Sequence, residues 1–142
     1  MESEDKRRIT ESLTRRAGES PCAPQVAAAT VSTLQAMDAA LTPIIGQRGV
    51  AALYRRSLFL CTPGCDGLTA VLENVHSVME LAPLEQFLAG QHSADTFTAS
   101  VTLLTTFNEL LATLVGPSLT ERLLRSVWEH SFSGTAPQDI SP

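Results

Sequence analysis

The chain has 142 residues, 44% of them hydrophobic, and a formal net charge of −5 at pH 7. This length predicts one domain able to bury a core, and the acidic balance argues against nucleic-acid binding, which needs many Lys and Arg contacts with phosphates. The charged N-terminus lacks the apolar region of a signal peptide, and no apolar run reaches the length of a membrane span. With only three cysteines, we expect a reduced, cytoplasmic protein. The excess of arginine over lysine is typical of a GC-rich, bacterial-like genome.

Residues 1–22 are polar and predict a flexible N-terminal tail. Apolar residues then recur at spacings of three and four, which predicts five helices, over 24–45, 48–61, 67–81, 93–115 and from 117 onward. The helix over 93–115 is apolar on two sides, which is typical of a central helix. We therefore expect an all-α fold, a compact bundle of about five helices in a single domain at 23–133, followed by a flexible tail at 134–142.

A similarity with a period of 70 residues relates two parts of this pattern. It brings Leu41, Gly46 and Leu53 onto Leu111, Gly116 and Leu123. One interpretation is a duplication, which would give two pseudo-symmetric helical hairpins with the helix over 67–81 inserted between them. The other is that amphipathic hairpins resemble one another in pattern. Under both interpretations, Gly46 and Gly116 each suit the end of a helix, because glycine takes a left-handed conformation without a Cβ clash.

The stretch CTPGC at 61–65 contains two of the three cysteines. Cys61 continues the apolar face of the helix over 48–61, so we expect it to pack inward as a small hydrophobic residue. The alternatives are a reversible disulfide with Cys65 or a metal site with Cys65 and His76. These three residues are only weak candidates for a metal site, because a closed zinc site needs four ligands and no fourth is evident. We expect no bound cofactor and no metal.

Two alternative functions depend on other residues of the predicted bundle. Met37, Met79 and Phe107 are candidates to line an interhelical pocket in a small-ligand sensor or carrier. His76 is a candidate for phosphate transfer, although the nearby Glu80 would repel a phosphoryl donor. The sequence has neither a Gly-rich phosphate loop nor a G-x-S-x-G motif, so we do not expect an enzyme.

The arginines are separated from the acids along the sequence. No Lys or Arg occurs between Ser57 and Glu121, whereas the flanking helices carry Arg48, Arg55, Arg56, Arg122 and Arg125. If these helices pack side by side or across a dimer axis, the five guanidiniums would bind an anion or an acidic partner surface. The alternative is a solvated polar face on each helix. We therefore expect a non-enzymatic protein-interaction module, a small regulatory or adaptor protein acting as a homodimer, with no nucleic-acid or membrane partner.

Overall fold

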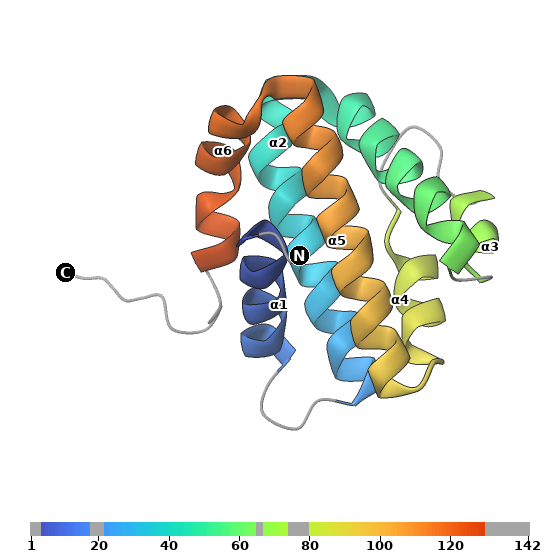
Figure 1. The fold of residues 1–142 in the computed structure, drawn as a ribbon. Coiled ribbons are helices and arrows are strands. Elements are labelled where there is room, and N and C mark those ends of the chain that lie inside the picture. The colour runs from blue at the N-terminus through green and yellow to red at the C-terminus, as the bar shows by residue number, and fades with distance from the viewer. Residues whose placement is uncertain (1–3, 18–21, 65–66, 74–79, 130–142) are drawn as a thin grey trace.

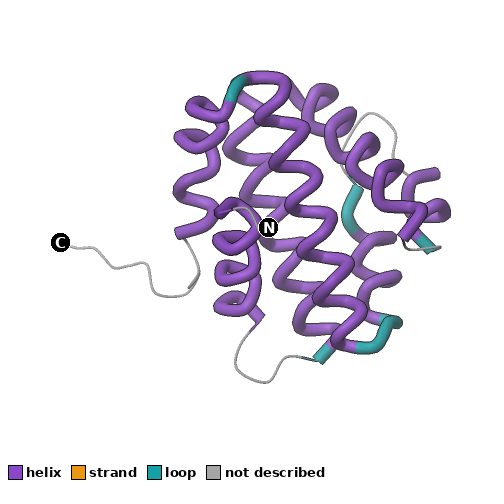
Figure 2. Tube along the Cα trace, in the orientation of Figure 1, coloured by secondary structure: helices purple, strands orange, loops and turns teal. Residues whose placement is uncertain are grey.

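The computed structural model describes residues 4–17, 22–64, 67–73 and 80–129. These ranges contain six α-helices and one 3₁₀ turn: α1 (Glu4–Ala17), α2 (Ala23–Cys61), η1 (Thr62–Gly64), α3 (Leu68–Glu73), α4 (Ala82–Ala89), α5 (Ser93–Val115) and α6 (Pro117–Glu129). No strand occurs in these ranges, as Figure 2 shows, which confirms the predicted all-α class.

Helices α2 and α5 form the centre of the bundle, and the other helices pack around them (Figure 1). Gly46, at φ 83° and ψ 160°, divides α2 into a first arm (23–45) and a second arm (47–61). The first arm and α5 run in the same direction; the second arm turns back along one flank and α6 along the other (Figure 1). The predicted break at Gly46 is therefore confirmed, and α5 has the predicted bounds.

The core between the two central helices is made mainly of aliphatic side chains. Its fully buried members include Leu34, Met37, Leu41, Leu58, Leu104, Phe107 and Leu111. Small polar residues are also buried there, and several donate their hydroxyl groups to helix carbonyls. Thr30 donates to the carbonyl of Val26 at 2.8 Å, and Thr96 of α5 donates to the carbonyl of Leu88 in α4 at 2.7 Å. These hydrogen bonds offset the cost of burying the hydroxyl groups.

Helix α1 corrects the prediction of a flexible tail over residues 1–22. Ile9 and Leu13 are each only 1% exposed, and Ala17 is buried one turn further on. This four-residue spacing gives α1 a narrow apolar stripe, which packs against α2, α5 and α6. The charged residues around this stripe made the segment resemble a polar tail in the sequence. Burial of the apolar side chains Ile9, Leu13 and Ala17 stabilises the helix in its place.

Arg16 ties the end of α1 to two other helices. Its guanidinium donates to the Ser32 hydroxyl of α2 at 3.0 Å and to the Val127 carbonyl of α6 at 2.9 Å. Val127 lies in the last turn of α6, where carbonyls lack partners within the helix and a cation is favoured. Burial lowers the pKa of Arg16 from its ordinary value, but the group stays charged at neutral pH. Arg16 therefore acts as a structural contact between helices.

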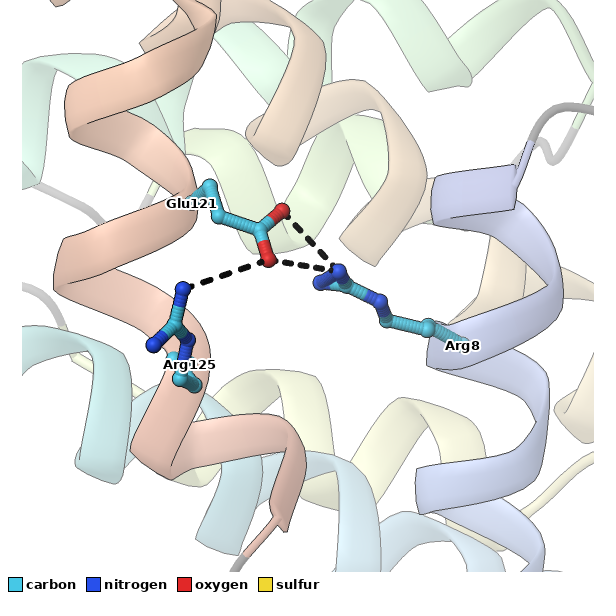
Figure 3. Close-up of polar contacts among 3 residues, drawn as sticks. All are labelled: Arg8, Glu121 and Arg125. Atoms are coloured by element: carbon cyan, nitrogen blue, oxygen red, sulfur yellow. Dashed lines mark hydrogen bonds and ion pairs between the residues drawn. The ribbon is translucent and has the colours of Figure 1, made fainter.

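A second contact joins α1 to α6 through Glu121 (Figure 3). One terminal nitrogen of Arg8 lies 2.9 and 2.8 Å from the two carboxylate oxygens of Glu121, and Arg125 lies 3.9 Å from one of them. All three side chains are partly exposed to solvent. The carboxylate of Glu121 therefore joins α6 to Arg8 of α1.

We expect the Arg8–Glu121 pair to contribute about 0.2–1 kcal/mol to folding stability, because water and salt screen a partly exposed ion pair. A double-mutant cycle with Arg8→Ala and Glu121→Ala, followed by urea unfolding at low and high salt, would measure it. The coupling should shrink as salt rises. A coupling above about 2 kcal/mol, unchanged by salt, would contradict this assignment and indicate a desolvated pair.

The region after η1 differs in detail from the predicted helix over 67–81. The structure describes α3 from Leu68 to Glu73, and residues 74–79 lie outside the described ranges. Pro83 then falls in the first turn of α4, where its missing N–H is tolerated. Leu84 and Leu88 of α4 are buried in the common core, so this segment, which lies between two of the predicted helices, is a packed helix.

The 70-residue period coincides with the boundaries of the helices. A shift of 70 residues brings the first residue of α5, Ser93, onto the first residue of α2, Ala23. The same shift brings Gly116, at φ 96° and ψ 151°, onto Gly46, at φ 83° and ψ 160°. Both glycines therefore occupy nearly the same backbone conformation, and a shorter helix follows each of them.

Candidate protein-interaction surface

The outer face of the second arm of α2 combines positive charge with exposed apolar side chains. We call this surface the basic–apolar face and define it by Arg48, Arg55, Arg56, Phe59 and Leu60. Phe59 is 53% exposed and Leu60 is 42% exposed. Spacings of three, four and seven residues place all five on one side of the helix. Apolar residues of this size are usually buried, so their exposure beside three arginines requires an explanation.

The opposite side of the second arm anchors it to the bundle. Val50, Tyr54 and Leu58 are fully buried there. Burial raises the pKa of the Tyr54 phenol above its ordinary value, because the charged phenolate loses its hydration. Tyr54 therefore stays protonated at neutral pH. The second arm thus presents the basic–apolar face to solvent from a firmly packed helix.

The guanidiniums of the basic–apolar face are available for outside partners. None of Arg48, Arg55 and Arg56 has an ion-pair partner among the residues that the structure describes. The guanidinium carbon of Arg56 lies 5.6 Å from the centre of the Phe59 ring, within the range of a cation–π contact. This stacking orders both side chains and leaves the N–H groups of Arg56 open to an external carboxylate or phosphate.

The structure does not bring the five predicted arginines together within one chain. Arg122 and Arg125 lie on α6, which occupies the opposite flank of α5 from the second arm of α2 (Figure 1). Arg125 also lies beside Glu121, as Figure 3 shows. The single cluster of five guanidiniums is therefore wrong for one chain, and the three arginines of the second arm form a separate group.

A second group of exposed apolar residues lies near the points where α5 meets α6 and where the two arms of α2 meet, at the same end of the bundle (Figure 1). Ile44 is 53% exposed and Leu114 is 60% exposed. Each lies two residues before its glycine, and each is followed by a partly buried residue, Ile45 or Val115. We call these four residues the glycine-end patch. The 70-residue shift brings Ile44 onto Leu114, so it relates two exposed, large apolar side chains.

The predicted interhelical pocket is not supported by the placement of its residues. Met37 and Phe107 are both fully buried in the continuous core, where they fill space between the central helices. Met79 lies outside the described residues. The two described residues are therefore core residues and do not line an opening at the surface.

The CTPGC stretch is described only in part. Cys61 ends α2 and is buried, with its sulfur 3.7 Å from the Thr106 hydroxyl of α5. This is the inward packing predicted for Cys61. Cys65 and His76 lie outside the described residues, so their part in a disulfide, a metal site or phosphate transfer stays a prediction. Among the residues that are described, no three His, Cys, Asp or Glu side chains are grouped so as to hold a metal ion.

Helix α5 has the length and apolar composition of a membrane-spanning helix, the one such helix found among the described residues. Within its most apolar window, 39% is buried inside the bundle. The core helix of a globular bundle meets the same criterion, so this feature alone does not place the chain in a membrane.

Sequence reasoning identified the arginines of the basic–apolar face but missed Phe59 and Leu60. The signal was present: Phe59 lies three and four residues after Arg56 and Arg55, on the same side of a helix. An apolar residue in register with arginines is a sign of an exposed apolar position, and this sign requires no knowledge of the fold.

The chain matches no protein-family model, no curated protein and no solved structure. The features of the described residues that point to a function are the basic–apolar face and the glycine-end patch.

Proposed function

We propose that this protein is a non-enzymatic, helical protein-interaction module that acts as a homodimer. The observation that carries the proposal is the exposure of large apolar side chains at two places, while most other large apolar residues in the described ranges lie in or against one continuous core. Exposed apolar residues that are grouped, and not scattered singly, are typical of protein-binding surfaces.

We further propose that the bundle consists of two equivalent halves related by an approximate twofold axis parallel to α5 and the first arm of α2. The shared helix boundaries and the matching conformations of Gly46 and Gly116 support this. The burial pattern also repeats, because residues paired by the shift are fully buried together: Leu34 with Leu104, Met37 with Phe107, and Leu41 with Leu111. A duplication accounts for all three observations.

This symmetry supports the glycine-end patch as the site of self-association. Ile44 and Leu114 would flank the approximate axis, so the patch resembles itself after a half turn. A twofold interface brings one surface patch against the same patch of a second copy, and a self-similar apolar patch suits that arrangement. The interface would bury Ile44 and Leu114 of both copies and leave the basic–apolar face open.

We expect the double variant Ile44→Ser/Leu114→Ser to raise the dimer dissociation constant at least about tenfold, because four apolar side chains would leave the interface. Sedimentation velocity over a concentration series would measure it. The matched control is Ala28→Ser/Thr98→Ser, an exposed pair related by the same 70-residue shift. A monomeric wild-type protein at every concentration would overturn the homodimer, and equal effects of both double variants would overturn the patch.

A further inference from the structure

The two proposed halves differ on their outer faces. The second arm of α2 and α6 occupy equivalent positions, and the 70-residue shift pairs Phe59 with Glu129 and Arg56 with Ser126. Helix α6 nevertheless buries its own inner residues, with Leu124 fully buried and Val127 only 2% exposed. Packing of such a helix therefore does not require an exposed aromatic residue. The exposed ring of Phe59 is therefore not accounted for by packing within the chain, and a binding partner would account for it.

We propose that the basic–apolar face binds an acidic amphipathic segment of a partner protein. Aliphatic side chains of that segment would cover Phe59 and Leu60, and its carboxylates would pair with Arg48, Arg55 and Arg56. This inference rests on the proposed function as an interaction module and names the class of its partner. Arginine and aromatic residues together are typical of the residues that contribute most to binding at protein interfaces.

The charge distribution favours an acidic partner at this face in particular. The chain as a whole carries a net charge of −5, so its overall charge does not attract an acidic segment, and the attraction must come from a local group of arginines. The three arginines lack ion-pair partners among the described residues, and each guanidinium can bind a carboxylate with two parallel hydrogen bonds. Arg48 and Arg55 are seven residues apart, about 10 Å along the helix. A helical partner with acids seven residues apart would match this spacing.

A membrane surface is a poorer match for the same face. A helix that lies in a membrane interface inserts a whole apolar side into the lipid. In the second arm of α2 that side is occupied by Val50, Tyr54 and Leu58, which are buried against the bundle. Phe59 and Leu60 are the exposed large apolar side chains of this arm, too few to form the apolar side that such a helix inserts into lipid.

The binding test uses the full-length protein and two synthetic probes. Both are fluorescent helical peptides of about 18 residues with leucines at spacings of three and four; one carries glutamates at the remaining positions and the other lysines. We expect the acidic peptide to bind at least about tenfold more tightly than the basic one in fluorescence anisotropy, with affinity falling as salt rises. Equal affinity for the two peptides would overturn the proposal.

Paired variants locate the binding site. Arg55→Glu/Arg56→Glu and Phe59→Ser/Leu60→Ser should each weaken binding of the acidic peptide at least about tenfold. Arg122→Glu/Arg125→Glu makes the same change of net charge on α6 and should leave binding within about twofold, which separates specific pairing from general attraction. Circular dichroism of each variant would check that it is folded. Equal weakening by both charge variants would overturn the assignment to this face.

Two further measurements separate other occupants from the proposed one. Binding of phosphatidylglycerol vesicles that is lost in Phe59→Ser/Leu60→Ser, without peptide binding, would overturn the proposal in favour of a membrane surface. A dimer that dissociates in the same variant would overturn it in favour of a second copy. Failure of the peptide assay alongside a dimer that depends on Ile44 and Leu114 would leave the interaction module standing and remove only this inference.

Discussion

Replacing Phe107 with alanine should lower the free energy of unfolding by about 3–5 kcal/mol, the largest effect we expect from a single substitution in this chain. Phe107 of α5 is fully buried in the core, and so is Met37, the residue 70 positions earlier in the first arm of α2. Removal of the ring loses its transfer energy and leaves a cavity that a bundle of rigid helices closes only in part. Urea unfolding followed by circular dichroism would measure the change.

Phe59→Ala provides the control, because it removes the same ring from an exposed position. Phe59 is 53% exposed, so we expect a loss of about 1 kcal/mol or less, including its contact with Arg56. The two variants also separate the predicted pocket from the core. A ligand-binding protein with Phe107 in its pocket would tolerate Phe107→Ala and lose ligand. A stability loss below about 1 kcal/mol at Phe107 would therefore contradict its assignment to the core.

The helices that the sequence predicted well are those whose apolar residues follow a strong period. Helix α5 has a long, regular pattern, and both of its ends match the prediction. The break in α2 was predictable because a glycine ends the apolar stripe at position 46. Helix α1 was missed because Ile9 and Leu13 are isolated among charged residues, and such a sequence becomes a helix only when the rest of the bundle covers its narrow stripe.

The sequence was enough to predict which arginines belong to the candidate site, but not which of them lie close together in the fold. The arginines could be assigned to two helices from their spacing alone. Whether Arg55 and Arg125 meet depends on the direction in which the chain leaves Gly46 and Gly116, and no local pattern determines that direction. The chain turns to opposite flanks of α5 after the two glycines (Figure 1), so the arginines separate into two groups.

Gly46 and Gly116 account for that separation, and their replacement should be costly. We expect Gly46→Ala and Gly116→Ala each to lower the free energy of unfolding by about 1–3 kcal/mol, because positive φ with ψ near 155° is a region that essentially only glycine occupies. An added Cβ meets no atom within 4 Å at either position, so the cost is conformational and not a clash.

Gly90→Ala is the matched control for this pair of variants. Gly90 also follows a helix, but at φ −86°, and an added Cβ there makes only ordinary contacts. We expect the free energy of unfolding of Gly90→Ala to be unchanged or raised by up to about 1 kcal/mol, because alanine restricts the conformations of the unfolded chain. Thermal and urea unfolding of the three variants would measure the differences. Equal losses at positions 46 and 116 would mean that the two halves use the same turn in the same way. A loss at only one of them would contradict their equivalence, and with it the symmetric glycine-end patch on which the proposed dimer depends.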